Sequence, residues 1–166
     1  METTEAILKR RSVRNFKDKP VPDDAVKKLL EAARLAPTGG NRQPWKFVAV
    51  RNPKMIRNIK MFSEGLGGVP TLVICVCCDD MNPVTVMDIA MASENIMIQC
   101  VDLGLGSCAI ASFNQEAVKK LLEVPAEVQM PLLLSIGYPE GEPRIRPKKE
   151  LKQVAYGEKY GGELKI

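Results

Sequence analysis

The chain has 166 residues, of which 45% are hydrophobic and 27% charged, a size and balance typical of one soluble globular domain. Its net charge of +4 is mild for a nucleic-acid-binding protein. The absence of histidine excludes His-based acid–base catalysis, Ser–His and Cys–His nucleophile systems and most zinc sites, so an enzyme of this composition is expected to use a cofactor.

Helical and strand patterns follow one another along the chain. Apolar spacing and capping residues predict five helices: one ending near Lys9, one from Pro22 to the loop at Pro37, one from Asn52 to about Met61, Val84–Leu103 and Gln115–Leu122. Runs rich in β-formers predict four strands: Trp45–Val50, Thr71–Cys78, Ser107–Ala111 and Leu132–Tyr138. Helices come first and strands then interleave with helices, which indicates an α+β or α/β fold with one sheet covered by helices.

Two segments are apolar almost throughout. Thr71–Cys78 is expected to be a central strand that is buried on both faces. Val84–Leu103 is apolar or small all round, so this helix is expected to lie deep in the core or to pack against a second subunit.

The five cysteines lie in apolar stretches, are odd in number and form no CxxC pair, which indicates reduced, buried thiols. The N-terminus has no apolar signal core, and the longest apolar run, Val69–Cys78, is too short to span a bilayer. We therefore expect a cytoplasmic protein without a membrane or nucleic-acid partner.

Basic residues cluster near both ends of the chain, with six Lys or Arg in residues 9–19 and four in residues 144–149. If the two clusters converge in space, their mutual repulsion requires an anion. A phosphate monoester, with up to about two negative charges, suits such a site because arginine can grip it with two parallel hydrogen bonds. The alternatives are two solvated termini or a nucleic-acid patch, and the few aromatic residues disfavour the latter.

The loop from Pro37 to Trp45 is the most unusual stretch of the sequence. Its two glycines permit positive φ and close approach to a ligand, and the amides of Asn41 and Gln43 both donate and accept hydrogen bonds. An isoalloxazine ring needs such mixed recognition along its pyrimidine edge. The alternative is a helix C-cap followed by a turn.

Four segments together resemble the FMN-dependent nitroreductase family, in the family's order: Arg10–Phe16, Ala36–Phe47, Gly104–Phe113 and Arg146–Lys148. The resemblance implies an α+β fold with a central mixed, mainly antiparallel sheet covered by helices. The sequence itself shows no domain boundary, so we expect a single domain over residues 1–166, with the polar, Pro- and Lys/Arg-rich tail from about residue 139 as a C-terminal arm. The expected assembly is an intertwined homodimer with two FMN sites at the subunit interface and the helix Val84–Leu103 as its spine.

The resemblance also implies residue roles. Arg10 would lie near the FMN phosphate, Arg14 near the N1/O2 edge of the ring, and the backbone N–H of Ala111 near N5. The partner subunit would supply the loop residues from Thr38 to Gln43. The full set of implied FMN contacts is Arg10, Arg11, Ser12, Arg14, Thr38, Gly39, Asn41, Gln43, Ile110, Ala111, Ser112, Arg146 and Lys148.

The implied activity is hydride transfer from NADH or NADPH through FMN N5 to a nitroaromatic, a quinone or a similar acceptor, by a ping-pong mechanism without a metal or a catalytic side chain. The short connection Asp79–Val86 predicts an open, shallow substrate pocket. Asp88 and Glu94 are candidate salt-bridge partners of the basic loops. Two alternatives stay open: a flavoprotein of the same fold that fragments flavin or removes halogen reductively, and a non-catalytic flavin-binding protein.

Overall fold

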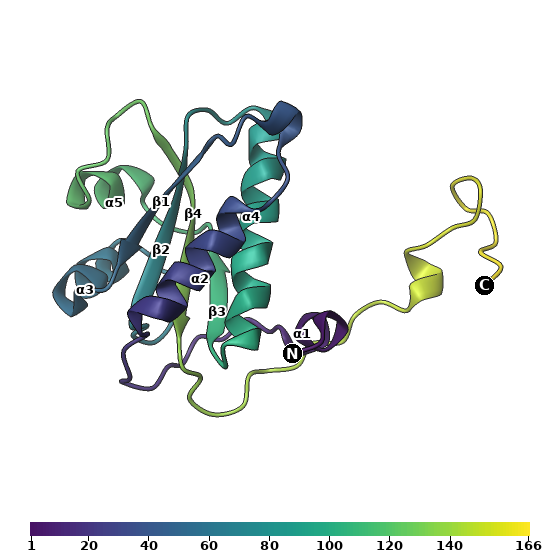
Figure 1. Ribbon diagram of the computed structural model, residues 1–166, viewed down its shortest axis with the longest axis horizontal. Coiled ribbons are helices and arrows are strands. Elements are labelled where there is room, and N and C mark those ends of the chain that lie inside the picture. The colour runs from purple at the N-terminus through teal and green to yellow at the C-terminus, as the bar shows by residue number, and fades with distance from the viewer.

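The computed structural model describes all 166 residues (Figure 1). Its α-helices are α1 (Thr3–Lys9), α2 (Asp23–Arg34), α3 (Pro53–Met61), α4 (Pro83–Asp102) and α5 (Gln115–Leu121). Its strands are β1 (Trp45–Val50), β2 (Leu72–Cys78), β3 (Gly106–Ile110) and β4 (Gln129–Gly137). Two short 3-10 helices, η1 (Gly39–Asn41) and η2 (Leu151–Gln153), complete the elements.

The four strands form one sheet in the order β1-β2-β4-β3, and every neighbouring pair is antiparallel. The expected α+β fold with a mainly antiparallel sheet is confirmed. Within this chain the one parallel pairing is an isolated bridge between Ser12 and Ser107, so the mixed character that the resemblance implied is confined to that contact.

The central strand β2 is buried along its whole length, as predicted. Its side chains alternate between two hydrophobic clusters, because successive residues of a strand point to opposite faces. Leu72, Ile74 and Val76 join the cluster beneath α2 and α4, whereas Val73 and Cys75 join the one beneath α3 and α5. The sheet is therefore covered on both faces (Figure 1).

The long helix α4 has two different faces. One packs against α2 and the sheet and buries Ile89, Ile96 and Cys100. The other leaves Met87 55% exposed and Met91 39% exposed in the single chain. By length and composition alone α4 could cross a membrane, but its packing is that of a core helix with one apolar face uncovered.

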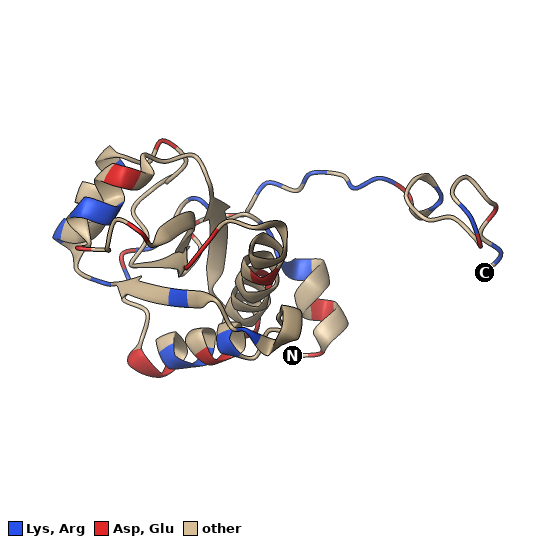
Figure 2. Ribbon diagram, turned by 90° about the horizontal axis from the view of Figure 1, so that it is seen from above, with Lys and Arg blue, Asp and Glu red and all other residues tan.

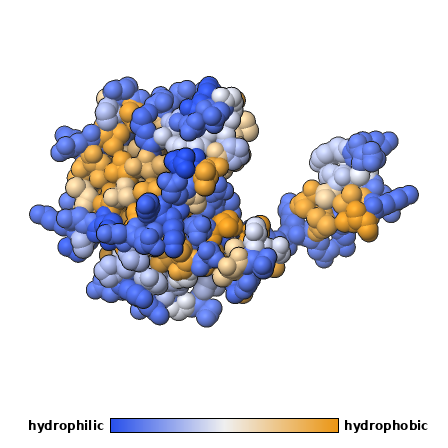
Figure 3. Space-filling view, viewed as in Figure 1, coloured by the Kyte–Doolittle hydropathy of each residue, from blue (hydrophilic) through white to orange (hydrophobic).

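The C-terminal arm, residues 139–166, leaves the body and extends away from it (Figures 1 and 2). Its apolar side chains gather at the distal end (Figure 3) and are largely exposed, with Tyr160 at 93% and Ile166 at 96%. Exposed apolar side chains that gather in one place often mark an interaction surface.

All five cysteines are free and buried, as predicted. Burial raises the pKa of the Cys75 thiol to about 12, that of Cys77 to about 11 and that of Cys100 to about 12. The reactive thiolate is therefore scarce near neutral pH, and these side chains pack in the hydrophobic core.

Candidate functional site

The two basic segments of the chain meet beside the start of β3 and the end of β4. The N–H of Val13 donates to the carbonyl of Ser107 at 2.9 Å, and the N–H of Glu140 donates to the carbonyl of Asn15 at 3.0 Å. Gly106 permits the first contact, since a Cβ there would lie 2.6 Å from the Val13 side chain. Backbone hydrogen bonds thus hold the N-terminal segment between β3 and the start of the arm.

This crossing creates a cavity of about 630 Å³. The wall of the cavity contains six cationic side chains and one carboxylate. The lining residues are Ile7, Leu8, Arg10, Arg11, Ser12, Arg14, Glu94, Arg144, Arg146 and Lys148. Cations gathered in one concave surface repel one another and attract an anion. The convergence of the two basic clusters, on which the phosphate-site hypothesis depends, is present in the structure.

The neighbouring residues Arg10 and Arg11 are engaged differently. Nη1 of Arg11 donates to the carbonyls of Leu8 and Arg10 at 2.6 and 2.7 Å, where the end of α1 leaves carbonyls without helical partners. Nε of Arg10 lies 3.3 Å from Oε1 of Glu94, an ion pair that confirms the expected role of Glu94. The Nη groups of Arg10 therefore stay available to a ligand, whereas Arg11 partly serves to hold the helix end.

The loop Gly65–Gly68 is a part of the site that the sequence interpretation missed. A Cβ on Gly67 would lie 2.9 Å from Cβ of Arg14, and Gly68 has a φ of +55° beside the Arg14 carbonyl. The N–H of Gly65 donates to the carbonyl of Ser112 at 3.4 Å. The loop thus joins Arg14 to the segment after β3, and its three glycines were the available signal.

The segment Ile110–Ser112 begins where β3 ends. Ile110 is buried, while Ala111 and Ser112 are exposed. The N–H of Ala111 donates to no backbone carbonyl. This donor is available to a bound group, as the resemblance implies, and its contact with flavin N5 stays a prediction.

The loop with Thr38, Gly39, Asn41 and Gln43 lies apart from the cavity of its own chain. Asn41 and Gln43 adopt positive φ values of 55° and 51°, and the N–H of Gln43 donates to Oγ1 of Thr38 at 3.2 Å. The N–H of Gly39 donates to Oδ1 of Asp88 at 3.1 Å, near the start of α4. The single chain does not bring these four residues to the cations.

Asp88 was wrongly expected to pair with a basic loop. Its side chain is buried, with 1% of the residue exposed, and it lies beneath the loop that carries Gly39. Its Oδ2 has no hydrogen-bond partner. Glu94, which does pair with Arg10, lies six residues further along α4, or about 9 Å along the helix axis.

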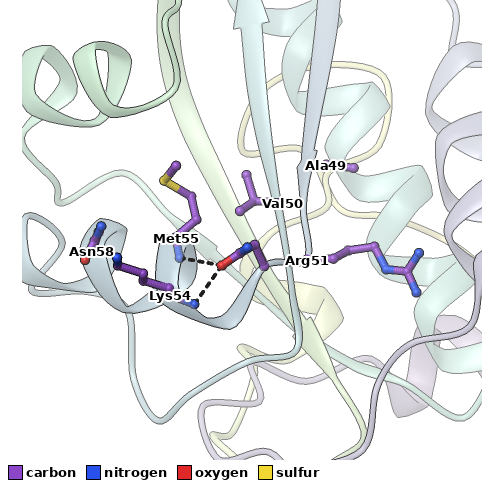
Figure 4. A pocket seen from close by; sticks show the side chains of 7 residues that line it. Ala49, Val50, Arg51, Lys54, Met55 and Asn58 are labelled. Atoms are coloured by element: carbon purple, nitrogen blue, oxygen red, sulfur yellow. Dashed lines mark hydrogen bonds between the residues drawn. The ribbon is translucent and has the colours of Figure 1, made fainter.

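A second cavity, of about 580 Å³, lies beside the start of α3 (Figure 4). There Oδ1 of Asn52 accepts the N–H groups of Lys54 and Met55, shown as dashed lines, and Arg51 forms an ion pair with Asp23. Because the first donors of the helix and the arginine are already partnered, this cavity is a poorer anion site than the one at Arg10.

Comparison with known proteins identifies the family of the chain. The model of the nitroreductase family matches residues 7–66 and 78–138. An Archaeoglobus fulgidus protein provisionally named NADH dehydrogenase/NAD(P)H nitroreductase is 32% identical over 153 residues, covering 85% of this chain and 87% of the relative. An iodotyrosine deiodinase of Thermotoga neapolitana is 26% identical, covering 86% of this chain and 91% of its own. The solved structure of an FMN-dependent nitroreductase from Clostridium difficile superposes with a TM-score of 0.82 at 28% identity, covering 92% and 97% of the two chains. The chain belongs to the nitroreductase family.

Proposed function

We propose that this protein is an FMN-dependent oxidoreductase that moves a hydride from NADH or NADPH through FMN N5 to a nitroaromatic, a quinone or a similar small acceptor. The observation that carries the proposal is the cavity in which the basic segments from the two ends of the chain meet. The FMN-dependent nitroreductase among the structural neighbours supports the choice of cofactor.

The residues of the cavity fit the phosphate of FMN. Arg10, Arg146 and Lys148 supply charge for the phosphate, and Ser12 supplies a hydroxyl. When bound, FMN would supply the N5 atom that accepts a hydride from the nicotinamide nucleotide and passes it on to the acceptor. Arg14 would then supply positive charge to the ring, and the N–H of Ala111, which donates to no backbone carbonyl, would supply a hydrogen-bond donor.

The assembly in this proposal is a homodimer with shared sites. The uncovered apolar face of α4 provides the contact between subunits, and the arm of residues 139–166 reaches the partner from a single domain. The loop with Thr38, Gly39, Asn41 and Gln43 lies away from its own cavity and serves the cavity of the partner. The buried, reduced thiols suit the cytoplasm.

The acceptor reaches an open site in this proposal. Only four residues, 79–82, connect β2 to α4, so no long insertion between these elements covers the ligand. Bulky planar acceptors are therefore admitted as readily as small ones, and selectivity rests on stacking and reduction potential.

The experiment follows the absorbance spectrum of the flavin. We expect the purified protein to take up added FMN, to lose the flavin absorbance under anaerobic NADH or NADPH, and to regain it when a nitroaromatic or a quinone is added. A protein that binds no FMN would end the proposal. A protein that binds FMN but is not bleached by either nucleotide would instead favour a same-fold flavoprotein with different chemistry, a class to which the deiodinase relative points.

A further inference from the structure

One acidic side chain stands in the cationic wall. Glu94 projects from α4 and is the only carboxylate among the residues that line the cavity. In the single chain the side chain of Glu94 is 50% exposed, and that of its partner Arg10 is 24% exposed. A negative charge in the wall of an anion site weakens the binding of the anion, so its presence needs a physical reason.

The ion pair between Arg10 and Glu94 contributes too little to the stability of the fold to explain the presence of Glu94. The 3.3 Å contact joins Nε of Arg10 to Oε1 of Glu94 without the geometry of a hydrogen bond, and Glu94 forms no other ion pair. Half-exposed ion pairs of this kind contribute little to the folded state. Arg10 is also held in place by its position directly after α1, whose end Arg11 fastens.

The remaining consequence of Glu94 is electrostatic. A phosphate group that binds Arg10 must come within several ångströms of the carboxylate that already pairs with it. Two like charges at such a distance, in a partly exposed cavity, repel measurably. Glu94 and the phosphate therefore compete for the same guanidinium.

We propose that Glu94 sets the affinity of the cavity for phosphate-bearing ligands, weakening the hold of Arg10 on the phosphate so that the flavin nucleotide exchanges. This inference rests on the proposed function, because it assigns the phosphate of FMN to the cavity. Glu94 is an affinity-determining residue in this account and takes no part in hydride transfer.

The test is the substitution Glu94→Gln, which keeps the shape and the acceptor oxygen but removes the charge. Flavin fluorescence quenching measures the Kd of FMN and, in parallel, of riboflavin, which has the same ring and no phosphate. We expect the Kd of FMN to fall ~3- to 10-fold at low ionic strength and the Kd of riboflavin to stay constant. Added salt should shrink the difference, since ions screen exposed charges.

The matched control is Glu31→Gln. Glu31 has the same 50% side-chain exposure and an arginine partner, Arg34 at 2.8 Å, but lies on α2 outside the cavity. Its substitution should leave both Kd values unchanged. Thermal melts of both variants verify that the fold is intact.

The possible results of these titrations distinguish failure of the inference about Glu94 from failure of the proposed function. An unchanged or higher Kd for FMN in the Glu94→Gln variant would overturn the inference while leaving the proposed function in place. An equal gain for FMN and riboflavin would also overturn it, because the effect would then not involve the phosphate. A wild-type protein that binds no FMN would remove the proposed function and the inference with it.

Discussion

The cations of the cavity differ in what they already bind, and this predicts different effects of their removal. Arg10→Ala should weaken FMN binding by ~10- to 100-fold, the usual worth of charge-assisted hydrogen bonds, and should spare riboflavin. Arg11→Ala should cost less FMN affinity but lower the melting temperature, because its guanidinium fastens the end of α1. Titrations and thermal melts of the two variants provide the measurement. Equal losses of FMN affinity would contradict the division of roles.

Asp88 supports a second residue-scale prediction. Asp88→Ala would leave the N–H of Gly39 without its acceptor in a partly buried position, at a cost of ~1 to 3 kcal/mol in the free energy of unfolding. Asp88→Asn keeps one acceptor oxygen and should lose less. Urea denaturation measures both variants, and limited proteolysis should cut the loop around Gly40 faster in the alanine variant. A loss in the asparagine variant as large as that in the alanine variant would show that the charge, rather than the accepted hydrogen bond, is what matters.

At the scale of the elements, the exposed face of α4 predicts an association surface. Met91→Glu should convert a dimer to a monomer in light scattering after size-exclusion chromatography, because it places a charge in the apolar contact. The control is Met61→Glu on α3, where the residue is already 78% exposed and the substitution should change nothing. A wild-type monomer, or a dimer that survives Met91→Glu, would contradict a contact through α4.

The burial of Cys75 in β2 predicts how the stability of the fold depends on pH. The pKa of Cys75 is raised by burial from 9.0 to about 12, so the neutral thiol is favoured in the folded state. A raised pKa contributes stability that is complete below the ordinary pKa near 9 and is lost as the pH rises toward the folded value. The urea midpoint should therefore fall as the pH rises above about 9, and less steeply in Cys75→Ala. Identical slopes in the two proteins would refute this assignment.

The sequence predicts most elements because their periodicity is set by burial. The bounds of β1 agree residue for residue, and β2 begins one residue after the predicted Thr71. The prediction placed the start of β4 at Leu132, whereas the strand begins at Gln129. Pro131 argues against a strand because it lacks a donor, and an irregularity in the register between Val76 and Cys78 accommodates it.

The charge pattern predicted that the two basic segments converge, whereas the long-range contacts around them could not be predicted. The two basic clusters identified the cavity because like charges that meet need an anion. The role of Gly65–Gly68 depends on its packing against Arg14, and the role of Asp88 depends on burial beneath Gly39. The three glycines of that loop indicate a turn but not its contact with Arg14, and no local pattern places Asp88 beneath Gly39.

At the scale of the whole molecule, the two basic segments of one chain complete the anion site. The loop with Thr38, Gly39, Asn41 and Gln43 lies elsewhere. The first segment after α1 pairs with β3, and the residues after β4 return beside it. This closure brings Arg10 and Arg146 into one wall, although more than a hundred residues separate them in the sequence. A second subunit is then the source of the groups that frame the ring in the proposed function.

The most direct test is a crystal structure of the protein soaked or grown with FMN. We expect the phosphate in the cavity within hydrogen-bond reach of Arg10 and Arg146, the ring beside Ala111, and Asn41 and Gln43 of a second subunit at the pyrimidine edge of the ring. A phosphate bound away from both arginines, or a ring framed by the same subunit's own loop, would contradict this expectation.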